Sequence, residues 1–230
     1  MRDCATAWEH PRTRRVWIQQ VAVTVLRLIG WAAAAFGLLF LIVATPVGTG
    51  WIFFPLLVYA FFRAFLQFFC FPSSLRMRRV LQQYPWQVLP GVPRGLARHP
   101  EAQEDGMWFE FANPEDPAQR IPLIFLRSMR TYWWLRRIGG PRTKPEVKAR
   151  IEPLWFAGDP RFLAVIAAPA RDGRAPQRLH LLYQRPALDR RIPPRDWKAG
   201  PAALERARRA GARIPDSASA PDTGQELHEH

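Results

Sequence analysis

The chain has 230 residues, a formal net charge of +14, 23 prolines and two cysteines. This length allows one membrane hairpin and one modest soluble domain. Cys4 and Cys70 lack metal-ligand spacing, which argues against a zinc site and a structural disulfide. The positive charge has two natural partners, anionic lipid and nucleic acid, and lipid is the nearer one for an anchored protein.

Two apolar runs, residues 28–47 and 51–71, are separated only by Gly48, Thr49 and Gly50. Each run is long enough to cross about 30 Å of hydrocarbon. Pro46 closes the first run, and Pro55 falls near the start of the second, where a missing N–H costs little. The sequence therefore predicts a transmembrane helical hairpin with spans at about 25–47 and 51–71.

Charge predicts the orientation of this hairpin. Arg27 lies about 18 residues before the turn and Arg63 about 13 residues after it, so both fall on the side away from the turn. Both arginines can snorkel toward the headgroups, and Arg63 can instead bond the partner helix. The turn is uncharged and arginines flank both outer ends, so we expect both termini in the cytoplasm of a multi-pass plasma-membrane protein.

The regions on either side of the hairpin differ in composition. Residues 1–15 are polar and basic, and we expect them to be disordered. Residues 73–84 predict a basic helix along the cytoplasmic surface, with a solvated extension of the second span as the alternative. Residues 200–230 are rich in small and polar side chains and predict a disordered tail.

Residues 85–199 predict a cytoplasmic mainly-β domain with a barrel- or sandwich-like fold. Frequent prolines separate short apolar runs at 86–89, 107–111, 121–126, 154–156, 162–168 and 178–184. The order Trp, Pro-Arg, hairpin, Gln-Arg recurs at an interval of roughly 60–70 residues. This recurrence is consistent with two divergent three-stranded units that pack as one domain, or with chance.

An aromatic and basic stretch, residues 127–137, lies between the two sets of strands. Its tryptophans suit packing in a connecting helix, contact with a membrane interface, or stacking on single-stranded nucleic acid. Of these, nucleic acid is the least expected partner. Candidates for contact with the membrane interface along the whole chain are Arg27, Arg63, Arg76, Arg78, Arg79, Arg130, Trp133, Trp134, Arg136 and Arg137.

No motif in the chain predicts a catalytic, cofactor or metal site. His99 and His180 stand alone, without a cysteine, an aspartate or a second histidine at ligand spacing. Gly158, Asp159 and Pro160 predict a turn in which the aspartate accepts hydrogen bonds from nearby backbone N–H groups. A catalytic role for Asp159 is the minor alternative.

The stretch WFAGDPRF at residues 155–162 resembles one in uncharacterised two-span membrane proteins of high-GC Gram-positive bacteria. Tyr84 to Pro90, reading YPWQVLP, adds to this resemblance, which spans roughly residues 20–185. Those proteins often have Gly-Gly after the phenylalanine, whereas this chain has Leu163 and Ala164. The resemblance implies a hairpin followed by a soluble domain and implies no activity.

Three functions are compatible with these patterns. The first is a non-enzymatic membrane-anchored interaction or scaffolding module with a membrane or cytoplasmic protein partner. The second is a domain that senses anionic lipid headgroups. The third is an accessory subunit of a membrane enzyme or transporter.

Overall fold

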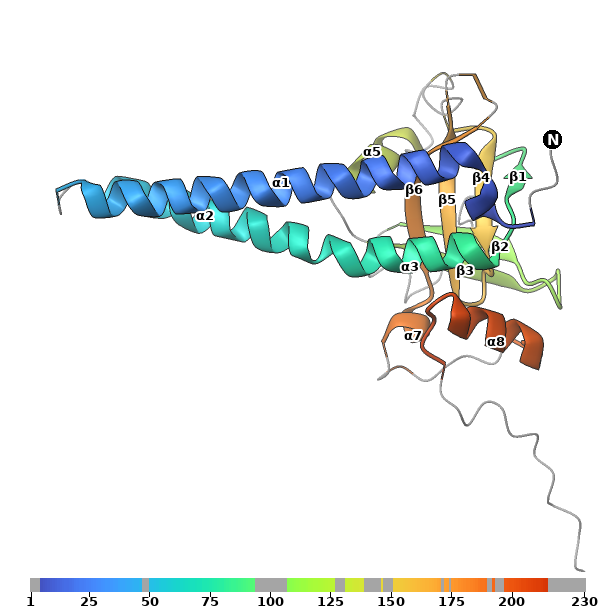
Figure 1. Cartoon of the computed structure of the whole chain (residues 1–230). Helices are drawn as coiled ribbons and strands as arrows, with labels where there is room; N and C mark the ends of the chain where they lie inside the picture. Colours follow the sequence, from blue (N-terminus) through green and yellow to red (C-terminus); the bar gives the residue numbers. More distant parts are fainter. Residues whose placement is uncertain are drawn as a thin grey trace, which may run out of the picture.

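A computed structural model describes residues 5–46, 50–93, 107–126, 131–138, 146, 151–170, 172–173, 175–189, 192 and 197–214. It shows a helical hairpin joined to a six-stranded antiparallel sheet that curls into a half-barrel (Figure 1). The predicted fold class, a helical hairpin plus a small mainly-β domain, is confirmed. Residues 1–4, Arg130 and residues 215–230, for which the sequence predicts disorder or membrane contact, lie outside the described residues.

Three helices build the hairpin and its base. They are α1 (Pro11–Ala44), α2 (Gly50–Phe68) and α3 (Cys70–Gln83). Pro72 explains the break between α2 and α3, because it cannot donate to the carbonyl of Phe68 and its ring crowds that carbonyl. Pro55 lies inside α2.

The outer part of the hairpin exposes its apolar side chains. In the most apolar 18-residue window of each candidate span, few residues are buried: 6% in Pro11–Ala44 and 11% in Gly50–Gln83. A helix in the core of a soluble protein would bury most of such a window. Inside the hairpin, Ala35, Leu57 and Ala60 form a small core with Trp31, Leu38 and Ile42 against it. The hairpin therefore has the length and the apolar surface that membrane association requires.

The sheet contains all six predicted strands. They are β1 (Gln87–Leu89), β2 (Trp108–Ala112), β3 (Arg120–Phe125), β4 (Leu154–Gly158), β5 (Leu163–Pro169) and β6 (Pro176–Tyr183), in the order β1-β4-β5-β6-β3-β2. Two antiparallel pairings, β1 with β4 and β3 with β6, join the two sets of strands. The second of these has only two residue pairs, so the sheet bends sharply there.

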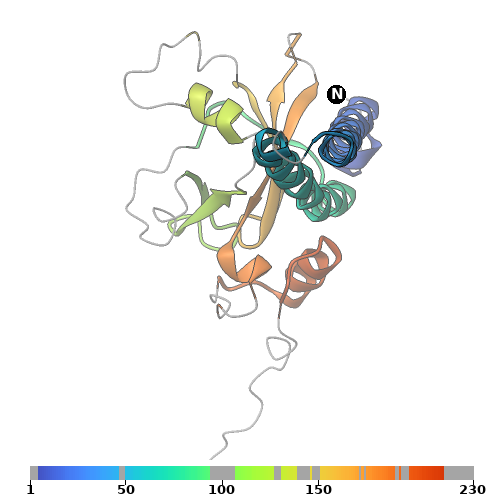
Figure 2. The ribbon, with the colours of Figure 1, turned by 90° about the vertical axis from the view of Figure 1, so that its left-hand side faces the viewer.

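Two hydrophobic clusters cover the two faces of the sheet. Viewed along the hairpin, α1 and α3 lie on one side of the sheet and α5 (Thr131–Ile138) lies on the other (Figure 2). The first cluster joins the α3 residues Met77, Val80 and Leu81 to Trp155, Val165, Leu179 and Leu181 of the sheet. The second joins Trp134 and Ile138 of α5 to Phe109, Phe125, Phe156 and Ile166.

The folded domain takes in more of the chain than residues 85–199. Helix α1 begins at Pro11, so residues 11–15 are helical and not disordered as predicted. Helix α8 (Pro201–Arg209) buries Ala207, and the chain continues through buried Ala210 and Ala212, which corrects the prediction of a disordered tail from residue 200. Small alanine side chains explain the second error, because they give a weak hydrophobic signal yet allow close packing.

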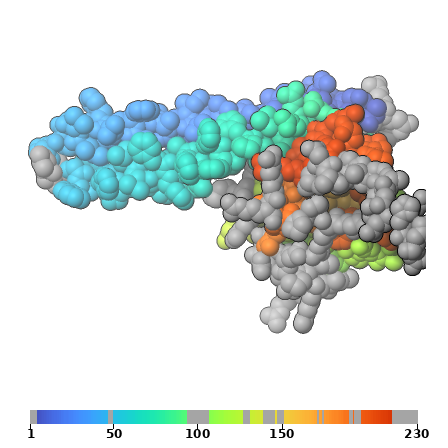
Figure 3. Space-filling view, turned by 90° about the horizontal axis from the view of Figure 1, so that it is seen from below, coloured from blue at the N-terminus to red at the C-terminus, as the bar shows by residue number. Residues whose placement is uncertain are grey.

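Helix α3 also differs from its prediction. Its apolar face packs on the sheet, so it is neither a surface helix lying along the membrane nor a solvated extension. In the space-filling view α1 and α2–α3 run side by side from the hairpin tip to the domain (Figure 3). Both arms therefore enter the core of the domain without an intervening linker.

Candidate functional site

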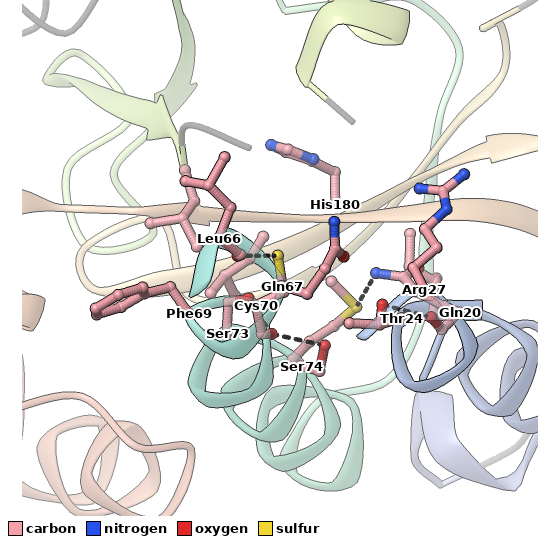
Figure 4. A pocket seen from close by; sticks show the side chains of 14 residues that line it. Gln20, Thr24, Arg27, Leu66, Gln67, Phe69, Cys70, Ser73, Ser74 and His180 are labelled. Carbon is pink, nitrogen blue, oxygen red and sulfur yellow. Dashed lines mark hydrogen bonds between the residues drawn. The ribbon is translucent and has the colours of Figure 1, made fainter. Parts of the chain in front are cut away.

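A cavity of about 430 Å³ lies where the hairpin meets the domain. Helix α1 forms one wall, the end of α2 and the start of α3 form the second, and β6 closes it (Figure 4). None of the lining residues is acidic. The lining consists of Gln20, Thr24, Arg27, Leu66, Gln67, Phe69, Cys70, Ser73, Ser74, Met77, Leu126, Leu179, His180 and Leu181.

The α1 wall is polar because three side chains share one helical face. Gln20, Thr24 and Arg27 are spaced four and three residues apart, which places them above one another on α1. The Thr24 hydroxyl donates to the carbonyl of Gln20 at 2.9 Å. The Gln20 amide lies 4.0 Å from the Met77 sulfur across the cavity.

The second wall contains hydroxyl groups that bond their own helix. The hydroxyls of Ser73 and Ser74 donate to the carbonyl of Cys70 at 2.7 and 3.0 Å. Both hydroxyls thus bond back to a single carbonyl of their own helix, a pattern common for serine in helices. The indole N–H of Trp17 donates to the Ser74 carbonyl at 3.0 Å and ties this wall to α1.

Gln67 and Arg27 are the two groups in this cavity whose polar ends have no partner among the described residues. Gln67 is only 6% exposed, and no hydrogen bond joins its amide to a described side chain or backbone group. Arg27 likewise has no ion pair within the described part of the chain. In Figure 4 both side chains extend from their helices toward β6. The Gln67 amide opens onto the cavity, so its hydrogen-bonding groups are available to a ligand that enters.

His180 belongs to the core and not to the polar wall. Its ring is 3% exposed and lies 5.1 Å from the Phe125 ring and 6.3 Å from the Trp134 ring, measured between centroids. It alternates with Leu179 and Leu181, which pack on the opposite face, as the sequence predicts. In Figure 4 its ring stands on the far side of the strand from α3.

Arg63 packs between the two arms of the hairpin. Its guanidinium lies 5.3 Å from the Trp31 ring and 5.9 Å from the Tyr59 ring. Such contacts are worth about 0.5–2 kcal/mol and increase when water is excluded. The contact with the α1 residue Trp31 is through its ring, and Arg63 Nε makes no hydrogen bond among the described residues, so the expected bond to the partner helix is not seen. Trp31, considered as an anchor in the interface, is half-buried within this cluster.

The three arginines of α3 contact the folded domain. Arg78 lies 5.2 Å from the Trp8 ring and 5.6 Å from the Trp17 ring. Arg76 and Arg79 lie beside Gly211, which follows α8. These contacts tie α3 to its neighbours in the domain, and the role of the three arginines at the membrane interface stays a prediction.

Helix α5 separates the two tryptophans that the sequence groups together. Trp134 is 1% exposed and packs in the core, so its prediction as an interface residue is wrong. Trp133 is half-buried, with the guanidinium groups of Arg137 and Arg178 lying 4.0 and 4.5 Å from its ring. Arg136 stays exposed and lies 5.7 Å from the Tyr132 ring.

The GDPR segment forms a rigid hairpin turn between β4 and β5. Asp159 accepts the backbone N–H of Arg161 at 2.9 Å, which confirms the predicted turn bonding. The Arg161 guanidinium is 4% exposed and also bonds Asp159, at 2.8 Å. Burial alone would lower the pKa of Arg161, but the hydrogen bonds and charges of Asp159 and Glu115 raise it. The role of these residues is thus to hold the turn between β4 and β5.

Sequence reasoning found Arg27 but missed its companions. Gln67 is visible as a polar interruption of an apolar run, and Gln20 as a residue at headgroup depth. The spacing of Gln20, Thr24 and Arg27 was an available signal. Arg27 and Gln67 lie at nearly equal distances from the hairpin tip, so antiparallel pairing of the two arms brings them to the same level.

Comparison with protein-family models, curated proteins and solved structures finds no match to this chain. The resemblance carried by WFAGDPRF therefore stays a prediction.

Proposed function

We propose that this chain is a non-enzymatic, two-span membrane protein whose β-domain is a rigidly mounted interaction module. The observation that carries the proposal is that the helices of the hairpin continue into the domain without a break in the packing. The apolar arms α1 and α2–α3 pass from an exposed hairpin into the core of the domain. A binding surface mounted in this way keeps a fixed height and orientation relative to the bilayer. That property suits a scaffold for a membrane or cytoplasmic protein partner, including the role of accessory subunit.

The proposed orientation places the domain and both termini in the cytoplasm. The described tip, Thr45 and Trp51, carries no charge, whereas arginines gather at the domain end of both arms. Cysteine labelling tests this orientation in a background without Cys4 and Cys70. Trp51→Cys should react with an impermeant maleimide in intact cells, whereas Arg209→Cys on α8 should react only after permeabilisation. The reverse pattern would reject the cytoplasmic domain.

The test of the interaction module is crosslinked co-purification from native membranes. The full chain should recover a defined partner in repeated experiments. A variant in which an unrelated two-span hairpin replaces the native one should lose that partner. Repeated recovery of no partner from the full chain would count against a scaffold.

A second candidate function, sensing of anionic lipid headgroups, is favoured by α5. Tyr132 and Leu135 are 66% and 43% exposed beside Arg136, on a helix whose other side is buried. An apolar and basic exposed face of this kind suits an interface. A spin label at Leu135→Cys should show oxygen accessibility typical of lipid in anionic nanodiscs. A label at Arg209→Cys is the control, and equal accessibility at both positions would reject this contact.

A further inference from the structure

The cavity between α1, α2–α3 and β6 lies at the depth where the proposed spans leave the hydrocarbon. Arg27 and Gln67 are each nearly five helical turns from the hairpin tip, or about 25 Å along the helix axis. The hydrocarbon core is about 30 Å thick. If the hairpin crosses the bilayer as proposed, both side chains lie at its cytoplasmic boundary, where phospholipid phosphates lie.

The chemistry of the cavity matches an anionic phosphate ester. Arg27 supplies a guanidinium that no described carboxylate neutralises, and guanidinium groups bind phosphate in a bidentate manner. The Gln67 amide supplies further donors and an acceptor, and it opens onto the cavity without a hydrogen bond from the described residues. A volume of about 430 Å³ falls within the roughly 300–1,000 Å³ range of ligand pockets.

The cavity also reaches the surface that would face the acyl chains. Phe69 lines it and is 60% exposed, and the neighbouring Phe65 is 59% exposed. The rings of these two residues stack edge to face at 4.6 Å between centroids. A lipid can therefore place its headgroup in the polar cavity while its chains stay against the aromatic surface of α2.

We infer that this cavity binds the headgroup of an anionic phospholipid, with its phosphate on Arg27 and its polar substituent on Gln67. The inference rests on the proposed membrane hairpin and deepens the lipid-sensing function by assigning it a site distinct from α5. Because α1, α3 and β6 all contribute to the walls, an occupied cavity joins the hairpin to the sheet. The same elements, α1, α3 and β6, would then both respond to the lipid composition and join the domain to the hairpin.

The experiment measures lipid retained by the full chain. Wild-type protein is reconstituted in nanodiscs containing phosphatidylglycerol and phosphatidylcholine, extracted gently, and its bound lipid is quantified by mass spectrometry. Phosphatidylglycerol should be enriched over its share of the bilayer. Arg27→Gln should reduce this enrichment roughly tenfold or more, the loss expected for one charge-assisted hydrogen bond. Arg209→Gln, an exposed arginine on α8 outside both the cavity and α5, is the matched control and should retain it.

Gln67→Leu distinguishes loss of lipid binding from misfolding, because lipid retention and thermal stability are measured on the same variant. The Gln67 amide makes no hydrogen bond to a described residue, so an apolar side chain of similar size should cost the fold little or nothing. This variant should therefore lose phosphatidylglycerol while its thermal unfolding temperature in lipid-free micelles is unchanged or higher. Retention of phosphatidylglycerol in both Arg27→Gln and Gln67→Leu would overturn the inference.

Two further arms separate the possible sources of failure. Millimolar inorganic phosphate should not displace the lipid, and full displacement would show that the site takes free phosphate instead. Alkaline carbonate extraction of the same membranes tests the hairpin itself. Release of wild-type chain into the soluble fraction would reject the membrane hairpin, whereas an integral chain without phosphatidylglycerol enrichment would reject only the lipid site.

Discussion

At the scale of single residues, the turn between β4 and β5 shows why a distinctive motif need not mark a catalytic site. Gly158 has a φ of +143°, and a Cβ atom there would lie 2.4 Å from the Ala164 Cα atom. Asp159 and Arg161 then close the turn with a buried ion pair. Gly158, Asp159 and Arg161 thus each have a geometric reason to be present, and the chemistry of the motif is used for folding.

The first prediction concerns Gly158→Ala. The strained φ and the collision with the Ala164 backbone should together destabilise the domain by about 3 kcal/mol. Urea unfolding of the full chain in micelles, followed by tryptophan fluorescence, measures the change. Gly173→Ala is the control, because its φ is +66° and a Cβ there meets nothing within 4 Å. Its cost should be only about 1 kcal/mol. Equal effects of the two substitutions would contradict the proposed crowding.

The second prediction concerns the buried ion pair. Asp159→Asn leaves the Arg161 guanidinium buried with the half-exposed Glu115 as its remaining carboxylate, so the free energy of unfolding should fall by about 3 kcal/mol. The exposed pair of Arg12 and Asp172, at 52% and 45% exposure, provides the comparison. Arg12→Gln should cost less than about 1 kcal/mol in the same unfolding experiment. A cost for Asp159→Asn as small as that of Arg12→Gln would show that the turn does not depend on the pair.

At the scale of elements, the strands and the hairpin could be predicted from sequence, because alternation and length are local signals. The two three-stranded sets are joined by antiparallel pairs, β1 with β4 and β3 with β6, as two facing units would require. A true repeat nevertheless stays a prediction, because β1 lies apart from β2 in the sheet. The site was only partly predictable: Gln20 and Gln67 are separated by a whole hairpin, and their meeting depends on tertiary packing.

Helix α5 illustrates the limit of composition and gives the third prediction. Three aromatic residues come first and two arginines follow, but the helical period buries Trp134 and exposes Tyr132. Trp134→Ala should therefore destabilise the domain by about 3–5 kcal/mol through a large core cavity. Tyr132→Ala should change the free energy of unfolding by less than about 0.5 kcal/mol. Thermal unfolding in micelles distinguishes them, and a small effect of Trp134→Ala would place α5 outside the core.

At the scale of the whole molecule, the junction between hairpin and domain determines how freely the domain can move relative to the hairpin. A domain on a flexible linker samples many heights above a membrane, and its partners must capture it by diffusion. Here α1 runs unbroken from Pro11 to Ala44, and only the single residue Phe69 separates α2 from α3. The orientation of the domain is therefore fixed by the hairpin, and a lipid in the cavity would act on a rigid joint.

The fourth prediction tests this rigidity directly. Spin labels at Trp51→Cys and Arg209→Cys, in a chain without its two native cysteines, report the distance from hairpin tip to α8 by pulsed electron paramagnetic resonance. The wild-type background should give one narrow distance distribution in nanodiscs, because both arms are anchored in the hydrophobic core of the domain. Insertion of three glycines after Phe69 releases α3 from α2 and should broaden the distribution. A wild-type distribution as broad as that of the insertion variant would mean that the domain swings on its anchor, and the rigid scaffold would have to be abandoned.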